Sequence, residues 1–149
     1  INKADNIKVE DRKKIKTKKG RIVYGGGGII PDVFVSIEKN HNKEGLELLL
    51  QSDIMSYYAF EKLDENRAFF SKMNKSELKK ELFKTDKYFN QFKEYVTSNG
   101  LLFNLSDQKE QILTYLYAEF SKQLFNDTSY YQIVLPGDKM IKKVLEKQK

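Results

Sequence analysis

The sequence predicts a mainly α fold, in which a bundle of about five helices follows a short β-hairpin-like arm. From about residue 44 onward, apolar side chains recur at spacings of three and four, which is the period of an amphipathic helix. Two prolines and eight glycines in 149 residues are few for a turn-rich all-β chain. We therefore expect a basic extended arm with short strands over residues 1–38 and a helical C-terminal domain over residues 44–149.

The positive charge of the chain is concentrated in the arm. Residues 1–21 hold nine of the 27 basic side chains but only three of the 21 acidic ones, so the remainder is neutral. Such a run is typical of a tail for nucleic acid or an anionic membrane, and equally of a solvated, extended segment. No aromatic residue precedes Tyr24, so the stacking platform of single-strand-binding proteins is missing. We favour the solvated segment and do not expect nucleic acid as a partner.

Two short strands are predicted on either side of a glycine run. Residues 21–24 and 33–37 are rich in β-branched and aromatic side chains, and Gly25–Gly28 lies between them. Ordering four consecutive glycines costs roughly 2–4 kcal/mol more conformational free energy than ordering four alanines. A phosphate cradle does not fit, because neither the dinucleotide fingerprint nor the Gly-Lys-Ser/Thr ending of a P-loop is present. A backbone that closely approaches a peptide or another strand, and a bulged connection between strands, remain as alternatives.

The first three helices are predicted from stripes and capping residues. The first stripe consists of Leu46, Leu49, Leu50, Ile54, Tyr57 and Tyr58. Asn74 with Glu77 three residues later resembles a capping box that opens a second helix. Thr85 and Asp86 can cap a third helix, and Gly100 follows its expected end. Its stripe consists of Tyr88, Phe89, Phe92, Tyr95 and Val96.

Two further helices complete the predicted bundle. Ser106 and Asp107 begin the longest one, whose apolar residues step by four. Pro136-Gly137 breaks the chain, and Asp138 can cap a last helix. Its stripe consists of Met140, Ile141, Val144 and Leu145. We expect all these stripes to form core, and nothing marks any of them as a cofactor-binding site.

The sequence contains few residues that could bind a metal ion or a cofactor. The chain has no cysteine, and its single histidine, His41, stands between two asparagines, where a loop residue is expected. No run of about 18 apolar residues predicts a membrane span. The first residues do not form a signal peptide. We predict no metal and no cofactor.

One segment resembles a known family. Residues 20–35 read GRIVYGGGGIIPDVFV and resemble the G-R-x-V-Y-G-G-G-G-I-x-P-D segment of bacterial carboxyl-terminal processing, or tail-specific, serine proteases. Downstream, Tyr95-Val96 with Gly100 and the run LFNDTSYYQI at residues 124–133 are similar to later segments of that family, in the same order. Residues 138–145 resemble its closing segment. Phe125-Asn126 departs from the family's Trp-Gly. The resemblance covers about residues 12–147.

The resemblance implies an activity to which this chain contributes no catalytic residue. The family hydrolyses peptides with a serine nucleophile and a lysine general base that must be held neutral. Both precede the glycine segment, and no serine or lysine here stands in a matching setting. The site residues that we assign form a structural motif: Gly25, Gly26, Gly27, Gly28, Pro31 and Asp32.

The same resemblance implies partners and a location. The chain is expected to be a non-catalytic C-terminal module with a structural, substrate-gating or oligomerisation role. Its expected partners are the upstream protease and PDZ domains of the same polypeptide, protein or peptide substrates, and copies of itself. The expected location is the bacterial cell envelope, periplasmic or secreted. One alternative is a helical binding module that uses its basic arm for anionic partners, and another is a helical adaptor unrelated to proteolysis.

Overall fold

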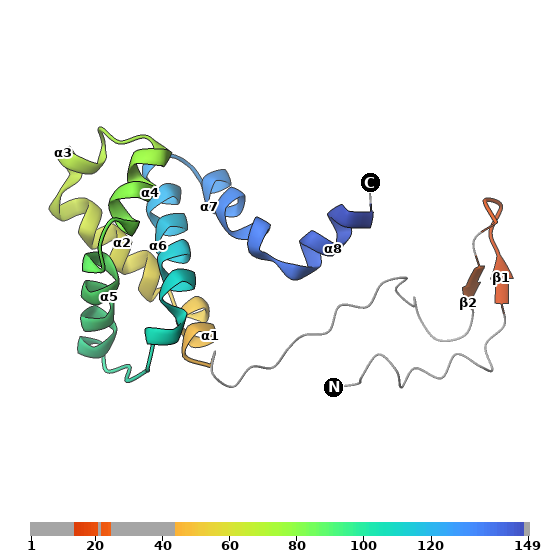
Figure 1. Cartoon of the computed structure of the whole chain (residues 1–149), viewed down its shortest axis with the longest axis horizontal. Coiled ribbons are helices and arrows are strands. Elements are labelled where there is room, and N and C mark those ends of the chain that lie inside the picture. Colours follow the sequence, from red (N-terminus) through yellow and green to blue (C-terminus); the bar gives the residue numbers. More distant parts are fainter. Residues whose placement is uncertain (1–13, 21, 25–43, 148–149) are drawn as a thin grey trace. The chain divides into compact units, whose positions relative to one another are not determined.

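The computed structural model describes residues 14–20, 22–24 and 44–147 (Figure 1). It divides the chain into two compact units, residues 1–39 and residues 40–149. The described part of the first is a β-hairpin, and the second is helical. The predicted mainly α fold with a short hairpin is thus confirmed.

The hairpin has a different strand pairing from the one that the glycine run suggested. Strand β1, Lys14–Lys16, is antiparallel to β2, Ile22–Tyr24, with Ile15 opposite Val23. In the turn, the Gly20 amide donates to the Thr17 carbonyl at 2.9 Å, and its φ of 82° explains the glycine. β2 was predicted, but β1 lies in the stretch expected to be merely extended. The second predicted strand, residues 33–37, lies outside the described residues.

The first predicted helical stripe is in fact carried by two helices, α1 (Glu44–Gln51) and α2 (Ile54–Glu65). Between them, the Ser52 hydroxyl donates to the Leu49 carbonyl at 3.0 Å. The break changes the helical phase, so Leu49 and Tyr58 are fully buried whereas Tyr57 is 63% exposed. A short helix, α3 (Arg67–Phe70), follows and was not predicted.

The predicted capping signals around α4 (Lys75–Phe83) and α5 (Lys87–Ser98) are largely confirmed. The Asn74 side chain accepts from the Ser76 and Glu77 amides, and the Glu77 carboxylate accepts from the Asn74 amide. Before α5, the Thr85 hydroxyl accepts from the Lys87 amide at 3.3 Å, whereas Asp86 makes no side-chain cap.

The end of α5 is a Schellman motif. The Gly100 amide donates to the Thr97 carbonyl at 3.0 Å, and the Leu101 amide donates to the Val96 carbonyl at 3.1 Å. The φ of Gly100 is 82°, a conformation that residues with a Cβ adopt at a cost. The predicted stop at Gly100 is therefore correct.

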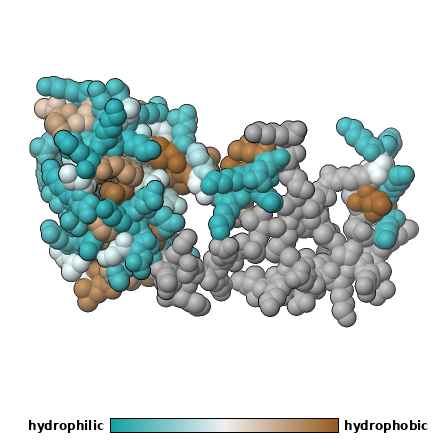
Figure 2. Space-filling view, viewed as in Figure 1, coloured by the Kyte–Doolittle hydropathy of each residue, from teal (hydrophilic) through white to brown (hydrophobic). Residues whose placement is uncertain are grey.

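Helix α6, Lys109–Leu124, is the central helix of the unit and begins after a 3₁₀ turn at Ser106–Gln108. It packs against α2, α4, α5 and α7. Helix α7, Asp127–Val134, was not predicted, although Asn126 opens it in the ordinary way by accepting from the Ser129 amide. Figure 2 shows that the visible surface of this unit is mostly hydrophilic, with its apolar side chains gathered in smaller patches.

The last helix, α8 (Lys139–Lys147), starts where the sequence predicts but does not bury its stripe. The Asp138 carboxylate accepts from the Met140 amide at 2.7 Å and from the Ile141 amide. The side chains of Met140, Val144 and Leu145 are nevertheless 53–56% exposed. The expectation that this stripe forms core is wrong, because α8 follows a 3₁₀ turn over Leu135–Gly137 that ends the packed part of the unit.

The stop at Gly100 can be tested by substitution. A Cβ at Gly100 would meet nothing within 4 Å, so Gly100→Ala costs only the left-handed conformation, and we expect about 1 kcal/mol of lost stability in urea unfolding. Gly137 also has open space around it but no positive φ, so Gly137→Ala is the matched control and should be neutral or slightly stabilising. Equal effects of the two substitutions would contradict this account of the helix end.

Candidate functional site

The residues that the sequence singles out for function lie outside the described structure. Gly25, Gly26, Gly27, Gly28, Pro31 and Asp32 are among them, and so is His41. Of the motif that resembles the protease family, the structure describes Gly20 in its turn and Ile22–Tyr24 in β2.

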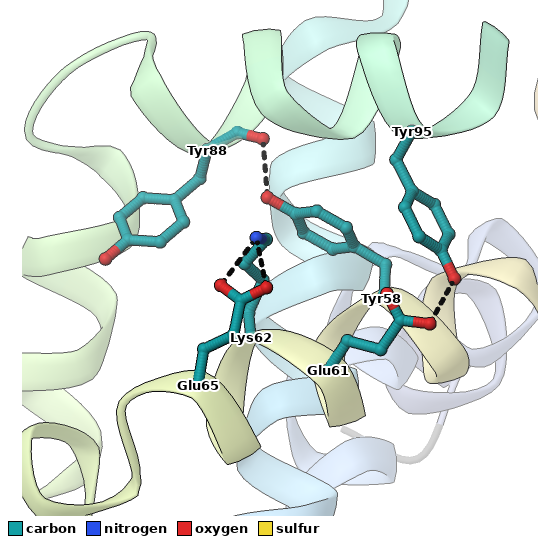
Figure 3. Close-up of polar contacts among 6 residues, drawn as sticks. All are labelled: Tyr58, Glu61, Lys62, Glu65, Tyr88 and Tyr95. Atoms are coloured by element: carbon teal, nitrogen blue, oxygen red, sulfur yellow. Dashed lines mark hydrogen bonds and ion pairs between the residues drawn. The ribbon is translucent and has the colours of Figure 1, made fainter. Parts of the chain in front are cut away.

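The polar contacts between α2 and α5 form a cluster (Figure 3). We call it the tyrosine cluster; it consists of Tyr58, Glu61, Lys62, Glu65, Tyr88 and Tyr95. The buried Tyr58 hydroxyl donates to the Tyr88 main-chain carbonyl at 3.3 Å. The Tyr95 hydroxyl donates to Glu61 Oε1 at 3.0 Å, and the rings of Tyr58 and Tyr95 lie 5.3 Å apart. The cluster thus joins two helices that are more than twenty residues apart in sequence.

The lysine of the tyrosine cluster is engaged by a carboxylate. Lys62 Nζ donates to Glu65 Oε1 at 2.9 Å and to Oε2 at 2.7 Å, and it lies 6.0 Å from the centre of the Tyr58 ring. Glu65 is one turn further along the same helix, so the pair is local. This ammonium group therefore pairs with a carboxylate and an aromatic face, not with a serine hydroxyl.

Burial determines what the tyrosine hydroxyls can do. It raises the pKa of Tyr58 far above the usual phenol value, with a smaller contribution from Tyr88 and neighbouring acids. Burial also raises the pKa of Tyr88 to about 12, helped by the charge of Glu81 and by the 3.2 Å hydrogen bond from Tyr88 Oη to Glu81 Oε1. Both phenols are neutral donors at ordinary pH, which suits them to holding helices together rather than to proton abstraction.

A second polar group lies between α6 and α7. Burial raises the pKa of Glu119, against the lowering effect of Lys122 and of a hydrogen bond with Ser56. Burial and the charge of Glu119 raise the pKa of Tyr130. Glu119 Oε2 is buried with no hydrogen-bond partner among the described residues. Glu119 is thus a carboxylate whose charged form is disfavoured by its position.

Several of the described serine hydroxyls bond within their own helix or helix end. Ser98 Oγ donates to the Glu94 carbonyl at 2.8 Å, and Ser129 Oγ donates to Asn126 Oδ1 at 2.9 Å. Ser76 and Ser106 are exposed at helix starts, where their amides donate to the side chains of Asn74 and Asn104. Within the described ranges, no three acidic or histidine side chains gather as a metal site. No helix there is long and apolar enough to cross a bilayer.

Comparison with known proteins places the chain in a family. Residues 46–126 match the model of DUF8443, a family of unknown function, and this match spans more than half of the 149 residues. The chain belongs to this family. The match runs from α1 to the residue that caps α7, so it covers the helices that pack around α6 except α7 itself. No curated protein and no solved structure matches the chain.

No motif in the sequence marks the tyrosine cluster as a site. Tyr58, Tyr88 and Tyr95 were all predicted as members of apolar stripes, and two of them are buried. Glu61, the hydrogen-bond partner of Tyr95, becomes recognisable only when α2 and α5 are packed together. The available signal was the use of Tyr where Phe would fill the same space, because a buried hydroxyl needs a partner.

The raised pKa values predict a loss of stability in alkali. An unfolded chain releases phenolic protons near pH 10, whereas folded Tyr58 and Tyr88 keep theirs, so the unfolded state binds fewer protons. The free energy of unfolding should therefore be unaffected below about pH 10 and fall between about pH 10 and about pH 12. Urea unfolding at several alkaline pH values measures this fall.

Substitution identifies the tyrosines responsible. Replacing Tyr58 and Tyr88 by Phe should make the alkaline fall shallower, since the groups that lose protons on unfolding are gone. Tyr57→Phe is the matched control, because its ring is 63% exposed, and it should keep the original slope. If the unsubstituted chain, the variant with Phe at both buried positions and Tyr57→Phe all lose stability equally steeply with pH, these two phenols do not govern the alkaline behaviour.

Proposed function

We propose that this chain is a non-catalytic C-terminal module of a bacterial serine endopeptidase that processes proteins at their C-terminal ends. The observation that carries the proposal is the sixteen-residue segment over residues 20–35 with its four consecutive glycines. In the proteases that it resembles, this segment follows the Ser–Lys catalytic part. The parent would act in the cell envelope, in the periplasm or after secretion.

The helical unit supports a structural role within such a protein. Some of its tyrosine hydroxyls join separate helices: the Tyr58 hydroxyl donates to the Tyr88 carbonyl, and Tyr117 Oη donates to the Lys75 carbonyl at 3.1 Å. A unit held together by such contacts can fold as a body beside a protease domain. Its role would then be to support the protease, gate substrate entry or mediate assembly.

Exposed apolar residues at both ends of the described chain also support the proposal. Ile15 and Ile22 of the hairpin are 48% and 54% exposed, and Val144 of α8 is 54% exposed. An isolated two-stranded hairpin is marginal in water, and it gains stability when its apolar residues pack against another body. The upstream protease and PDZ domains of the same polypeptide would provide that body, and protein or peptide substrates would reach the module through them.

The proposal is tested on the chain and on its gene. Residues 1–149 alone should neither react with a fluorophosphonate serine probe nor cleave casein, because the nucleophile and base would precede them. The reading frame upstream of Ile1 should encode a PDZ domain and the Ser and Lys motifs. In that longer protein, deleting residues 44–149 should change substrate turnover or oligomeric state while the serine still labels. Probe labelling of the isolated chain, or an upstream frame without these motifs, would refute the proposal.

A second function, the binding of anionic partners by the basic arm, is favoured by the hairpin. Lys14 and Lys16 of β1 and Lys18 and Lys19 of the turn are all exposed. In a strand, residues two apart lie on the same face, so Lys14 and Lys16 share one side of β1. Four lysines in six residues make a compact cationic surface.

Salt dependence tests this second function. If the hairpin binds polyanions, affinity for duplex DNA or for vesicles containing phosphatidylglycerol should fall steeply with added salt. Charge reversal at Lys18 and Lys19 should weaken binding about tenfold or more, whereas the same reversal at Lys142 and Lys143 of α8 should have little effect. An absence of binding to both polyanions at low salt would exclude this function.

A further inference from the structure

A solvent-open groove lies between α3 and α4. We call it the α3–α4 groove; its volume is about 860 Å³. Phe69, Met73 and Phe83 provide its apolar surface, and Lys72, Lys80 and Lys84 also line it. The Phe69 side chain is 48% exposed, whereas its neighbour Phe70 is buried. The surface of the groove is therefore partly apolar and partly cationic.

The local sequence explains why the groove exists. The capping box at Asn74 starts α4 directly after a short loop from α3, which brings Phe69 and Met73 beside the new helix. Helix α4 buries Leu78 and Leu82. The residues of α4 and its C-cap that line the groove lie on one side of the helix, because they are spaced by three and four. They are Glu77, Lys80, Glu81 and Lys84.

The two acidic residues of the groove are already in use. Glu77 accepts from the Asn74 amide at 2.9 Å as half of the capping box. Glu81 accepts from the Tyr88 hydroxyl at 3.2 Å and so helps to hold α4 against α5. Both carboxylates keep their charge but are held by these contacts, so three positive and two negative side chains give the groove lining a net charge of +1.

The three lysines of the groove, in contrast, are not paired with carboxylates of the described residues. Lys62, Lys109 and Lys143 each have a carboxylate within 4 Å. Among the described residues, no ion pair or ring contact involves Lys72, Lys80 or Lys84, and all three are exposed. The groove thus offers unused positive charge beside an apolar surface.

We propose that the α3–α4 groove binds an acidic, amphipathic peptide segment of another protein. Its apolar side chains would pack between Phe69, Met73 and Phe83, and its carboxylates would pair with the three lysines. The groove is wide and open, which suits a peptide or helix better than a small molecule that must be enclosed. The flexible side chain of Met73 would adapt to different apolar partners.

Charge argues against β1 or α8 of a second copy of this chain as the occupant. These two described segments expose apolar residues but are themselves basic: α8 carries four lysines and one glutamate. Either would meet like charge at the lysines of the groove. This inference does not depend on the proteolytic parentage proposed above, since it rests on the groove alone.

The proposal is tested with a designed probe. A fluorescein-labelled amphipathic peptide of about sixteen residues, with Leu at positions i, i+3, i+4 and i+7, Glu at four of the remaining positions and Ala at the others, is titrated into the full chain by fluorescence anisotropy. A control peptide has Lys in place of each Glu. We expect saturable binding of the acidic peptide, weakened by salt, and none of the basic one. Backbone amide shifts in NMR should map the contact to α3 and α4.

Variants decide whether the groove is responsible. Lys80→Glu with Lys84→Glu, and separately Phe69→Ser, should each weaken binding at least about tenfold. Their matched controls are Lys142→Glu with Lys143→Glu on α8 and Phe60→Ser on α2, whose side chain is 55% exposed. Circular dichroism checks that each variant folds, and the Phe69 variant keeps the test independent of the charge change.

Three outcomes would overturn the proposal. The first is the absence of saturable binding by the acidic peptide. The second is an equal loss of binding in groove and control variants, which would reduce the interaction to overall charge. The third is binding of phosphatidylglycerol vesicles without binding of the peptide, which would make a lipid surface the partner.

Discussion

The contacts of Phe120 on α6 with rings from three other helices are the constraint on which the helical unit depends. Its ring centre lies 5.5 Å from that of Phe70 and 6.4 Å from those of Tyr58 and Tyr88. These rings come from α2, α3 and α5, so one side chain sets the distance between α6 and three neighbours. Because tilted and edge-on ring pairs add about 0.5–1.5 kcal/mol each beyond area burial, the cluster favours one arrangement of the helices. The hydrogen bond from the Tyr58 hydroxyl to the Tyr88 carbonyl depends on that arrangement.

Several lysine side chains lie over the aromatic rings and so cover the core where it meets the solvent. Within the described residues, lysine ammonium groups lie 5.1–6.0 Å from the ring centres of Tyr58, Phe83, Tyr88, Phe89, Phe125 and Tyr130. The aliphatic stem of a lysine can cover the edge of a ring while its charge stays in water. A chain with many lysines can thus shield a core rich in phenylalanine and tyrosine. The lysines of the α3–α4 groove differ because none covers a ring, which leaves both Phe69 and their own charge open to a partner.

Local chemistry made part of this fold predictable from sequence. The capping box at Asn74 and the glycine stop at Gly100 were correct because they depend on residues within one helical turn. The split between α1 and α2 was missed, since the stripe continues across Ser52 and Asp53 although the backbone does not. The exposed stripe of α8 shows that an apolar face predicts a contact but does not say with what. The tyrosine cluster and the groove could not be predicted, because both arise where separate segments meet.

The family match and the glycine motif concern different parts of the chain, and this separates the two questions about function. The match covers residues 46–126, which hold the Phe120 cluster and the α3–α4 groove. The motif at residues 20–35 precedes it, in the other compact unit. The aromatic contacts of the core and the residues that line the groove all belong to the helical unit, so the groove does not depend on contacts with a protease domain. A peptide-binding surface on the bundle would therefore operate whether or not the parent is a protease, and the role of the glycine motif must be decided on the upstream sequence.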